Sequence, residues 1–374
     1  MGLVKRIAIV VGTRPEAIKL IPVYKALLAD PRFEVVLIST GQHHEMLQQI
    51  FSIFNVTPDV ELFLMKQDQT LAEITSLLFG NLDRVFSSQL FDIVVVQGDT
   101  TTAMVAAMTA FYRSIKVAHV EAGLRSFDMK SPFPEEMNRR IISLLASVHF
   151  APTKTALKSL ESEGIDNVFN VGNTVVDCLI NTMAKVRMEE GKYYEKFRMY
   201  FTSSDKLVLV TTHRRESFGE GIQNICLAIQ KLAFDYPAIK FIIPVHLNRN
   251  VRDTIYSLLL KISNICLIDP QPYDNMVFLM SKSYIILTDS GGIQEEAPSL
   301  NVPLIVMRSV TERPEGIDAG CSVLSGTTSE GIISAFNSIV KDDSVDSRMR
   351  NTANPYGDGR ASERIAQILY DFLK

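Results

Sequence analysis

The chain has 374 residues, of which 47% are hydrophobic, and its 38 basic and 42 acidic side chains give a formal net charge of -4. This length suits two domains with separate cores, and the near balance of charge argues against a nucleic-acid-binding surface. Only five apolar residues follow Lys5 and Arg6, which is too few for a signal peptide. No apolar run reaches the roughly 20 residues of a membrane span, so we expect a cytoplasmic protein.

Short runs rich in Val and Ile alternate with segments of helical spacing. Such runs predict buried parallel strands, because a strand covered on both faces need not alternate polar and apolar residues. In the first half they fall at residues 6–11, 35–40, 93–97, 117–120 and 148–151. Between them, residues 100–112 are so rich in apolar and small side chains that we expect a largely buried helix.

The alternation restarts after residues 185–206, a charged and aromatic stretch that we expect to be helix and linker at a domain boundary. The second set of predicted strands lies at residues 207–211, 241–245, 266–268, 284–287 and 303–307, and a long helix at 361–373 ends the chain. Two successive alternating sets predict an α/β protein with two Rossmann-like, doubly wound domains. Ligands bind such sheets outside the carboxyl ends of the strands, so the polar residues there are the candidate site.

The cysteines and histidines show no ligand pattern. The four cysteines lie far apart without a CxxC pair, so we expect reduced thiols in the core: Cys178, Cys226, Cys266 and Cys321. No HxH or HxxxH spacing occurs, so support for a metal site is weak and none is predicted.

The first predicted strand leads into Gly12-Thr13-Arg14-Pro15. Gly12 permits a tight turn, and Pro15 suits the first turn of a helix. A helix N-terminus with Arg14 beside it is suited to binding an anion. A plain strand-to-helix turn with a solvated arginine is the alternative.

Acidic residues lie at two predicted strand ends and at one predicted helix start in the first half. Asp99 ends one strand, Glu121 follows the next, and Glu135 and Glu136 open a helix. Asp99 could instead cap the helix that starts near residue 101, and the two glutamates could simply stabilise their helix by interacting with its dipole. Clustered carboxylates, however, raise one another's pKa and serve in proton transfer. We therefore favour a functional cluster of Asp99, Glu121 and Glu135.

The second half supplies groups suited to an anionic ligand. His213 and His246 end adjacent strands beside arginines, and Arg308 and Arg313 follow a later strand. The strongest local signal is the string TDSGGIQEE at residues 288–296, where two glycines bare their N–H groups at a helix start and can bind phosphate. One turn along that helix, a carboxylate at position 296 can accept both hydroxyls of a ribose.

At these motifs the chain resembles the non-hydrolysing UDP-N-acetylglucosamine 2-epimerases. The matching strings, in order along almost the whole chain, are GTRPEAIK, QGDTTT, HVEAGLR, SPFPEE, HRRESFG, PVHLN, LTDSGGIQEEAPSL and TERPEG. The resemblance implies a GT-B-like pair of domains with the substrate in an interdomain cleft. The N-terminal domain would span residues 1–172, with the C-terminal helix 360–374 packing back on it, and the UDP-binding domain would span residues 173–359.

Carried over by motif, the resemblance implies two sets of site residues. The catalytic set would be Asp99, Glu121, Glu135 and His213. The set that binds UDP and substrate would be Arg14, Lys19, Gln271, Met276, Ser290, Gly291, Gly292, Glu296 and Arg313. The implied reaction removes the C2 proton, expels UDP to leave a bound 2-acetamidoglucal, and re-adds UDP with the proton on the other face, without a cofactor. Which carboxylate is the base in each direction stays open, with Asp99 or Glu121 expected at C2 and Glu135 assisting.

The chain departs from the family pattern at a few positions. Met276 stands where an aromatic residue often packs near uracil, and a methionine can still pack there. His44 stands where members of the family commonly have an arginine. Some relatives bind substrate as an activator in a second site, which here would draw on Gln42, His43, Arg214 and His246. Because Glu45 and Asp68 differ from the regulated relatives, such activation stays open.

Alternative functions are an epimerase of a modified UDP-N-acetylhexosamine, a hydrolysing 2-epimerase, a GT-B glycosyltransferase and a catalytically silent nucleotide-sugar binder. The intact catalytic set argues against the silent binder, and Thr100 stands where hydrolysing relatives tend to carry arginine after Gly-Asp. By resemblance, the product would supply surface polysaccharide synthesis, and the partners would be a UDP-sugar and a second copy of the chain, with no nucleic acid and no membrane.

Overall fold

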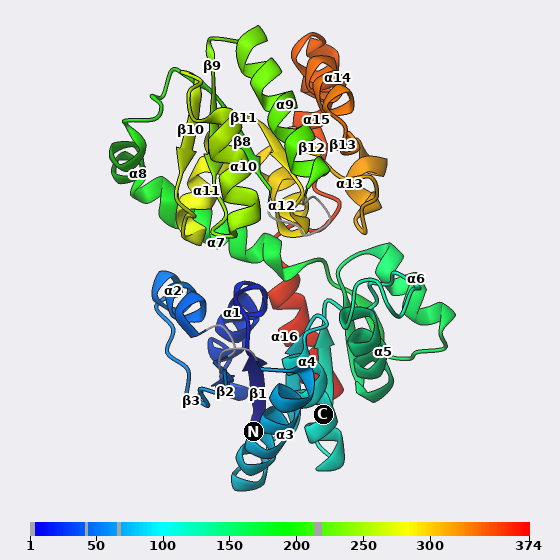
Figure 1. The fold of residues 1–374 in the computed structure, drawn as a ribbon. Coiled ribbons are helices and arrows are strands. Elements are labelled where there is room, and N and C mark those ends of the chain that lie inside the picture. The colour runs from blue at the N-terminus through cyan, green and yellow to red at the C-terminus, as the bar shows by residue number, and fades with distance from the viewer. Residues whose placement is uncertain (1–3, 42–43, 66–68, 213–218) are drawn as a thin grey trace. The chain divides into compact units, whose positions relative to one another are not determined.

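The computed structural model describes residues 4–41, 44–65, 69–212 and 219–374 (Figure 1). The chain divides into unit 1, residues 1–178 and 357–374, and unit 2, residues 179–356. Each unit is an open parallel sheet with helices on its faces, which confirms the predicted α/β class with two doubly wound domains. The division falls inside helix α7 (Thr174–Met188) rather than at residue 172 or in the stretch 185–206.

Unit 1 contains a seven-stranded sheet in the order β3-β2-β1-β4-β5-β6-β7. Its strands are β1 (Lys5–Val11), β2 (Phe33–Ser39), β3 (Val60–Glu61), β4 (Ile93–Gln97), β5 (Lys116–Val120), β6 (Val148–Ala151) and β7 (Val168–Asn170). Its helices, besides the start of α7, are α1 (Arg14–Leu28), α2 (His44–Phe54), α3 (Leu71–Ser88), α4 (Thr101–Tyr112), α5 (Glu135–Leu145), α6 (Lys154–Ser162) and α16 (Ala361–Phe372). Helix α4 is largely buried, as predicted.

Unit 2 contains a six-stranded sheet in the order β10-β9-β8-β11-β12-β13. Its strands are β8 (Lys206–Thr211), β9 (Ile239–Pro244), β10 (Ile265–Ile268), β11 (Ser283–Thr288), β12 (Leu304–Val306) and β13 (Ser322–Leu324). Its helices are α8 (Glu190–Phe197), α9 (Glu220–Asp235), α10 (Arg249–Leu259), α11 (Tyr273–Lys282), α12 (Gly291–Glu296), the 3-10 helix η2 (Ala297–Leu300), α13 (Pro314–Ala319), α14 (Ser329–Val340) and α15 (Asp343–Asn351).

The central strands carry no polar side, because parallel strands joined through helices are covered on both faces. In unit 1 every residue of β4 is buried, and the interior residues of β1 are fully buried. The core of unit 2 is built in the same way from β8, β9 and β11 against α9, α10 and α14. Strands β3, β7 and β13 were not predicted, because edge strands of two or three residues carry too little apolar pattern.

The C-terminal helix α16 belongs to unit 1, where it packs against α1. The carboxylate of Asp177, in α7, accepts the backbone N–H groups of Ala361 and Ser362 at 3.3 and 2.7 Å and so caps the start of α16. Burial raises the pKa of Asp177 despite these hydrogen bonds. None of the described helices is both long and apolar enough to cross a membrane.

The strand order places a switch point in each sheet. In unit 1 the chain winds outward in both directions from β1 and β4, and in unit 2 it does so from β8 and β11. At such a point the loops after the two central strands separate and leave room for a ligand outside the carboxyl ends. In unit 1 Arg14 follows β1 and Asp99 follows β4, and in unit 2 Ser290 follows β11, so each switch point carries candidate residues. Other candidates follow neighbouring strands: Glu121 follows β5, Gln271 follows β10 and Arg313 follows β12.

Candidate functional site

Asp99 lies in the turn between β4 and α4, at the switch point of unit 1. Its side chain is 27% exposed, and its carboxylate accepts hydrogen bonds from Arg139, one of them from Nε at 3.1 Å. Its backbone carbonyl accepts Nδ2 of Asn138 at 2.8 Å. The cap of α4 is Thr100, whose hydroxyl accepts the Ala103 N–H at 3.0 Å, so the alternative role of Asp99 as helix cap is wrong.

Glu121 follows β5 and is buried, with a positive φ of 63°. Its carboxylate pairs with Lys19 of α1, and Nε2 of Gln97 donates to the same oxygen at 2.6 Å. A buried carboxylate needs such donors, because burial of a charge without them is costly. We predicted Lys19 in contact with UDP; in this structure its ammonium group meets Glu121, and a contact with UDP stays a prediction.

Glu16 connects the loop after β1 to the turn after β4. Its fully buried carboxylate accepts the N–H groups of Gly12 and Thr13 at 2.8 and 2.6 Å and the hydroxyl of Thr100 at 2.5 Å. Burial raises its pKa, although each of these hydrogen bonds acts to lower it. Arg14, the first residue of α1, is half-buried beside this network.

The two glutamates that open α5 differ in their surroundings. Glu135 is half-buried, and the described residues include no hydrogen-bond or ion-pair partner for its side chain. Glu136 is fully buried and accepts the Ser126 N–H at 2.9 Å together with Arg139 and Arg140. Burial acts to raise the pKa of Glu136, but these hydrogen bonds and the charge of Arg139 lower it. Glu136 therefore supports the arginine that holds Asp99.

The corresponding edge of unit 2 is the turn from β11 into α12. Ser290 precedes the helix, and its N–H donates to the Thr288 hydroxyl at 2.9 Å. A Cβ on Gly291 would stand 2.7 Å from Cζ of Arg313, so this position must be glycine for the guanidinium to lie where it does. Nε of Arg313 donates to Glu295 at 2.7 Å.

The predicted nucleoside-binding residues also lie in unit 2. The buried carboxylate of Glu296 accepts the Tyr273 hydroxyl at 2.5 Å. Gln271 lies just before α11 and accepts Nδ2 of Asn275 at 2.8 Å, while Met276 is half-buried within α11. All three predicted residues therefore lie beside or on helices at the carboxyl edge of the sheet.

Several predicted residues lie outside the described part of the chain. These are the catalytic candidate His213 and three members of the possible second site, Gln42, His43 and Arg214. The fourth member of that site, His246, is exposed, and its Nδ1 accepts the N–H of Asn248 at 3.1 Å. The roles of all five residues stay predictions.

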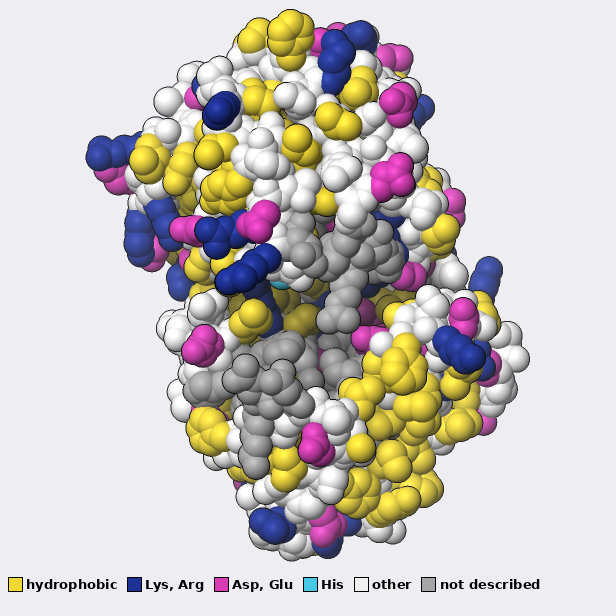
Figure 2. All heavy atoms as spheres, in the orientation of Figure 1, with side chains coloured by type: hydrophobic (Ala, Val, Ile, Leu, Met, Phe, Trp, Pro, Cys, Tyr) yellow, Lys and Arg dark blue, Asp and Glu magenta, His cyan; other side chains and the backbone are white. Residues whose placement is uncertain are grey.

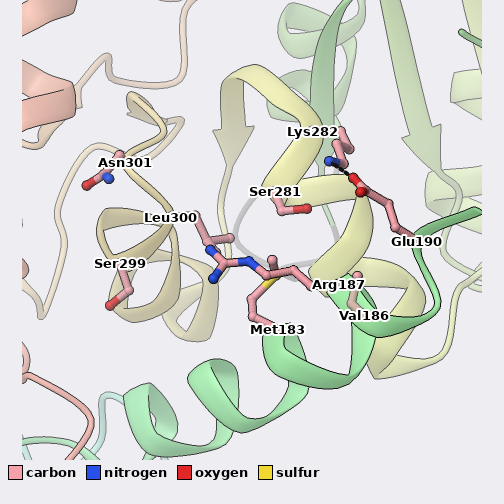
Figure 3. Close-up of a pocket in the computed structure, with 9 residues that line it drawn as sticks. All are labelled: Met183, Val186, Arg187, Glu190, Ser281, Lys282, Ser299, Leu300 and Asn301. Carbon is pink, nitrogen blue, oxygen red and sulfur yellow. Dashed lines mark hydrogen bonds and ion pairs between the residues drawn. The ribbon is translucent and has the colours of Figure 1, made fainter. Parts of the chain in front are cut away.

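Unit 2 also has a cavity of about 390 Å³ that includes none of the predicted residues (Figure 3). It is lined by the end of α7, the end of α11 and η2, and the ion pair of Lys282 with Glu190 lies at its side. Arg187 and Lys282 lie in the last turns of α7 and α11. The helix dipole stabilises basic side chains at a helix C-terminus, which explains their presence beside the cavity. Among the described residues, no group of three or more His, Cys, Asp or Glu side chains could hold a metal ion.

Sequence reasoning missed the residues that hold the others in place. Glu16 was detectable, because Thr13 and Glu16 form the Thr-x-x-Glu capping box. Asn138 and Arg139 follow the acidic pair along the chain, but their hydrogen bonds to Asp99 span about forty residues and depend on how α5 packs. The contacts of Gln97 and Tyr273 with Glu121 and Glu296 have no sequence signal.

The four cysteines carry free thiols, as predicted. Three are buried and Cys266 is half-buried. Burial raises the pKa of the Cys226 thiol to about 12 and that of Cys321 to about 11, so these are unreactive core residues.

The fold and the two strand edges define a class: a GT-B-like protein of two Rossmann-like domains, with carboxylates at one switch point and anion-binding groups at the other. A family model described as UDP-N-acetylglucosamine 2-epimerase matches residues 25–370. The chain therefore belongs to the UDP-N-acetylglucosamine 2-epimerase family, which confirms the resemblance.

Individual relatives are similar in sequence to this chain over nearly its whole length. The UDP-N-acetylglucosamine 2-epimerase of Campylobacter jejuni is 46% identical over 98% of both chains. That of Escherichia coli K12 is 44% identical over 97% of this chain and 98% of its own. The crystal structure of the Neisseria meningitidis enzyme bound to UDP-GlcNAc matches with a TM-score of 0.93 and 44% identity, covering 98% of this chain and all of its own.

Proposed function

We propose that the chain interconverts UDP-N-acetylglucosamine and UDP-N-acetylmannosamine by deprotonation at C2, elimination of UDP to a bound 2-acetamidoglucal, and re-addition of UDP. The single observation that carries this proposal is the pair of sheet edges. Hydrogen-bonded carboxylates lie at the edge of unit 1, and the Gly291-Gly292 start of α12 lies beside Arg313 at the edge of unit 2. The family relatives that are named for this activity support the choice of substrate.

The carboxylates of unit 1 would carry the proton transfers. The C2 proton is weakly acidic, so a base must lie close to it and an acid must serve the opposite face. Asp99 and Glu121 are each oriented by a basic side chain, and Glu135 lies one turn before Arg139 on α5. We assign the C2 chemistry to Asp99 or Glu121, with Glu135 assisting and His213 stabilising the departing UDP.

The edge of unit 2 would hold the nucleotide. The N–H groups of Gly291 and Gly292 and the hydroxyl of Ser290 suit the diphosphate, and the guanidinium of Arg313 adds a positive charge beside them. Glu296, oriented by Tyr273, would accept the ribose hydroxyls. Gln271 and Met276 would contact the uracil, with Arg14 and Lys19 on the sugar and phosphates.

The test is incubation with UDP-N-acetylglucosamine in D2O, followed by proton NMR. We expect a second anomeric signal of N-acetylmannosamine type that is still attached to UDP, with deuterium entering C2. Free N-acetylmannosamine with UDP as the main product would indicate the hydrolysing enzyme. Unchanged substrate, with UDP shown to bind, would contradict the proposal and direct attention to a modified UDP-sugar or to a transferase reaction.

We further propose that the enzyme acts as a homodimer. Figure 2 shows apolar side chains gathered over the part of unit 1 where Figure 1 draws α4 and α5, next to α3. Tyr112 of α4 is 69% exposed and Leu144 of α5 is 77% exposed. An apolar surface of this kind commonly marks a protein–protein contact. Analytical ultracentrifugation should give a dimer for the native chain and a monomer for Leu144→Lys; a monomeric native chain would contradict the proposal.

Two further predictions concern the cell rather than the molecule. We propose a cytoplasmic enzyme whose product enters surface polysaccharide synthesis. Cell fractionation tests the first, and loss of surface polysaccharide on deletion of the gene, restored by the native chain, tests the second.

A further inference from the structure

The turn that carries Asp99 is held by a side-chain hydrogen bond at each of its three residues. Gly98, with φ of 69°, has its carbonyl oxygen 2.7 Å from Nε2 of His119. The Asp99 carbonyl accepts the amide of Asn138, and the Thr100 hydroxyl donates to Glu16. The orientation of the Asp99 side chain therefore depends on three separate elements, β5, α5 and α1.

His119 contributes the contact closest to the strand end. It lies in β5, two residues before Glu121, and its ring is completely buried. The N–H of Gly98 donates to the Val120 carbonyl at 3.0 Å, so β5 holds Gly98 through its N–H and, by way of His119, through its carbonyl. Both peptide planes that flank Gly98 are thereby fixed.

The carbonyl of Gly98 can only accept, so Nε2 of His119 must carry the proton. Burial, reinforced by the neighbouring His149, lowers the pKa of His119 to about 3, so the ring is neutral at physiological pH. A neutral ring with the proton on Nε2 has no proton on Nδ1. Nδ1 has no hydrogen-bond partner among the described residues, so Nε2 provides the ring's one identified polar contact.

We propose that His119 is a positioning residue for the reaction: as a neutral donor to Gly98 it fixes the direction in which Asp99 presents its carboxylate. The proposal rests on the proposed function, because it assumes that Asp99 acts on the substrate. Without the donor, the Gly98 carbonyl would lose its side-chain partner and the Gly98–Asp99 peptide could rotate. A displacement of about 1 Å at a reacting group can cost roughly 10²-fold in rate.

His149 offers a matched control. It is the register partner of His119 on β6, it is equally buried, and the two rings meet edge to face with centroids 6.5 Å apart. Its backbone hydrogen-bond partner is Ala146, at the end of α5, rather than the turn that carries Asp99. Substitution at either position therefore disturbs the same part of the core, but only one touches the turn.

The experiment compares His119→Phe, His119→Gln, His119→Asn and His149→Phe by kcat, KM and Tm. We expect His119→Phe to lower kcat by about 10- to 100-fold, with KM and the affinity for UDP changed less than about twofold. Glutamine can place an N–H near the position of Nε2, so His119→Gln should recover most of kcat, whereas the shorter asparagine should not. His149→Phe should retain kcat within about twofold, even if its Tm falls as much as the Tm of His119→Phe.

The outcome that overturns the proposal is equal loss of kcat in His119→Phe and His149→Phe, or failure of glutamine to do better than asparagine, since either means that His119 only fills space. If the phenylalanine variant does not fold, the glutamine and asparagine variants still decide. Nitrogen-15 NMR of the native chain is independent of turnover: a proton on Nδ1 of His119 would also overturn the proposal. A native chain that does not epimerise its substrate would instead refute the proposed function.

Discussion

In unit 1 the strand ends carry carboxylates held by basic side chains, whereas in unit 2 they carry an arginine held by carboxylates. Asp99 and Glu121 are bound by Arg139 and Lys19, and Arg313 is bound by Glu295 and Glu312. The ion pairs are chemically alike, but the partner predicted to act in catalysis is a carboxylate in unit 1, whereas the partner predicted to bind the diphosphate is the guanidinium of Arg313 in unit 2.

The comparison shows how one architecture serves two tasks. Both sheets are parallel and doubly wound, and both bring their polar residues to the switch point. Proton transfer requires carboxylates of fixed direction, and binding of a diphosphate requires N–H groups and a cation. The division of labour therefore lies in the residues that follow the strands, not in the fold itself.

The strongest test of this comparison is to remove an acid of unit 1. Asp99→Asn keeps the shape of the side chain but cannot accept a proton as a carboxylate does. We expect turnover to fall by about 10²–10⁴-fold, with UDP affinity by calorimetry nearly unchanged, because Asp99 is assigned to the chemistry at C2 and not to UDP binding. Asp83→Asn, in a surface ion pair with Arg113, is the control. Normal turnover in Asp99→Asn would refute the assignment of unit 1 as the catalytic side.

Much of this comparison could be predicted from the sequence, because the signals are local. Runs of Val and Ile predict the buried strands, and the residues that follow them, such as Asp99 and Ser290, must lie at the same edge of a parallel sheet. The supporting partners could not be predicted in this way. Arg139 reaches Asp99 and Tyr273 reaches Glu296 only through tertiary packing, which no spacing in the sequence encodes.

A second test concerns how the unit 1 network is supported. Glu16→Ala removes the acceptor of two buried backbone donors and of the half-buried Thr100 hydroxyl, and an unsatisfied buried group costs about 1–3 kcal/mol. We expect a loss of about 3 kcal/mol in the free energy of unfolding, measured by urea denaturation, together with a clear fall in kcat. The control is Glu73→Ala, because Thr70 and Glu73 form an equivalent capping box on the exposed start of α3. Equal losses would mean that Glu16 only caps its helix.

The core of unit 1 should respond to acid through His149. Burial lowers the pKa of His149 to about 4. Below about pH 6.5 an unfolded histidine gains a proton that folded His149 does not, so its contribution to stability is present above that pH and is lost as the pH falls. Between pH 7 and pH 5 the loss is about 2 kcal/mol for such a group.

His149→Phe should remove this loss while leaving other titrations in place. Urea denaturation at pH 7 and pH 5 should therefore show a smaller difference for the variant than for the native chain, by about 2 kcal/mol. An unchanged difference would mean that His149 takes up a proton in the folded state, and unit 1 would then lack this source of acid sensitivity.

The smallest expected effect is a difference in UDP affinity between substitutions of two adjacent glycines at the edge of unit 2. A Cβ at position 291 would meet the guanidinium of Arg313 at 2.7 Å, whereas a Cβ at position 292 would stand 4.0 Å from Oε2 of Glu296, an ordinary contact distance. Gly291→Ala must therefore move Arg313, and we expect UDP affinity to fall about tenfold, which corresponds to about 1.4 kcal/mol. Gly292→Ala should lose less. Calorimetry with UDP distinguishes them, and equal affinities would show that Arg313 does not bind the nucleotide, which would break the contrast between the two edges.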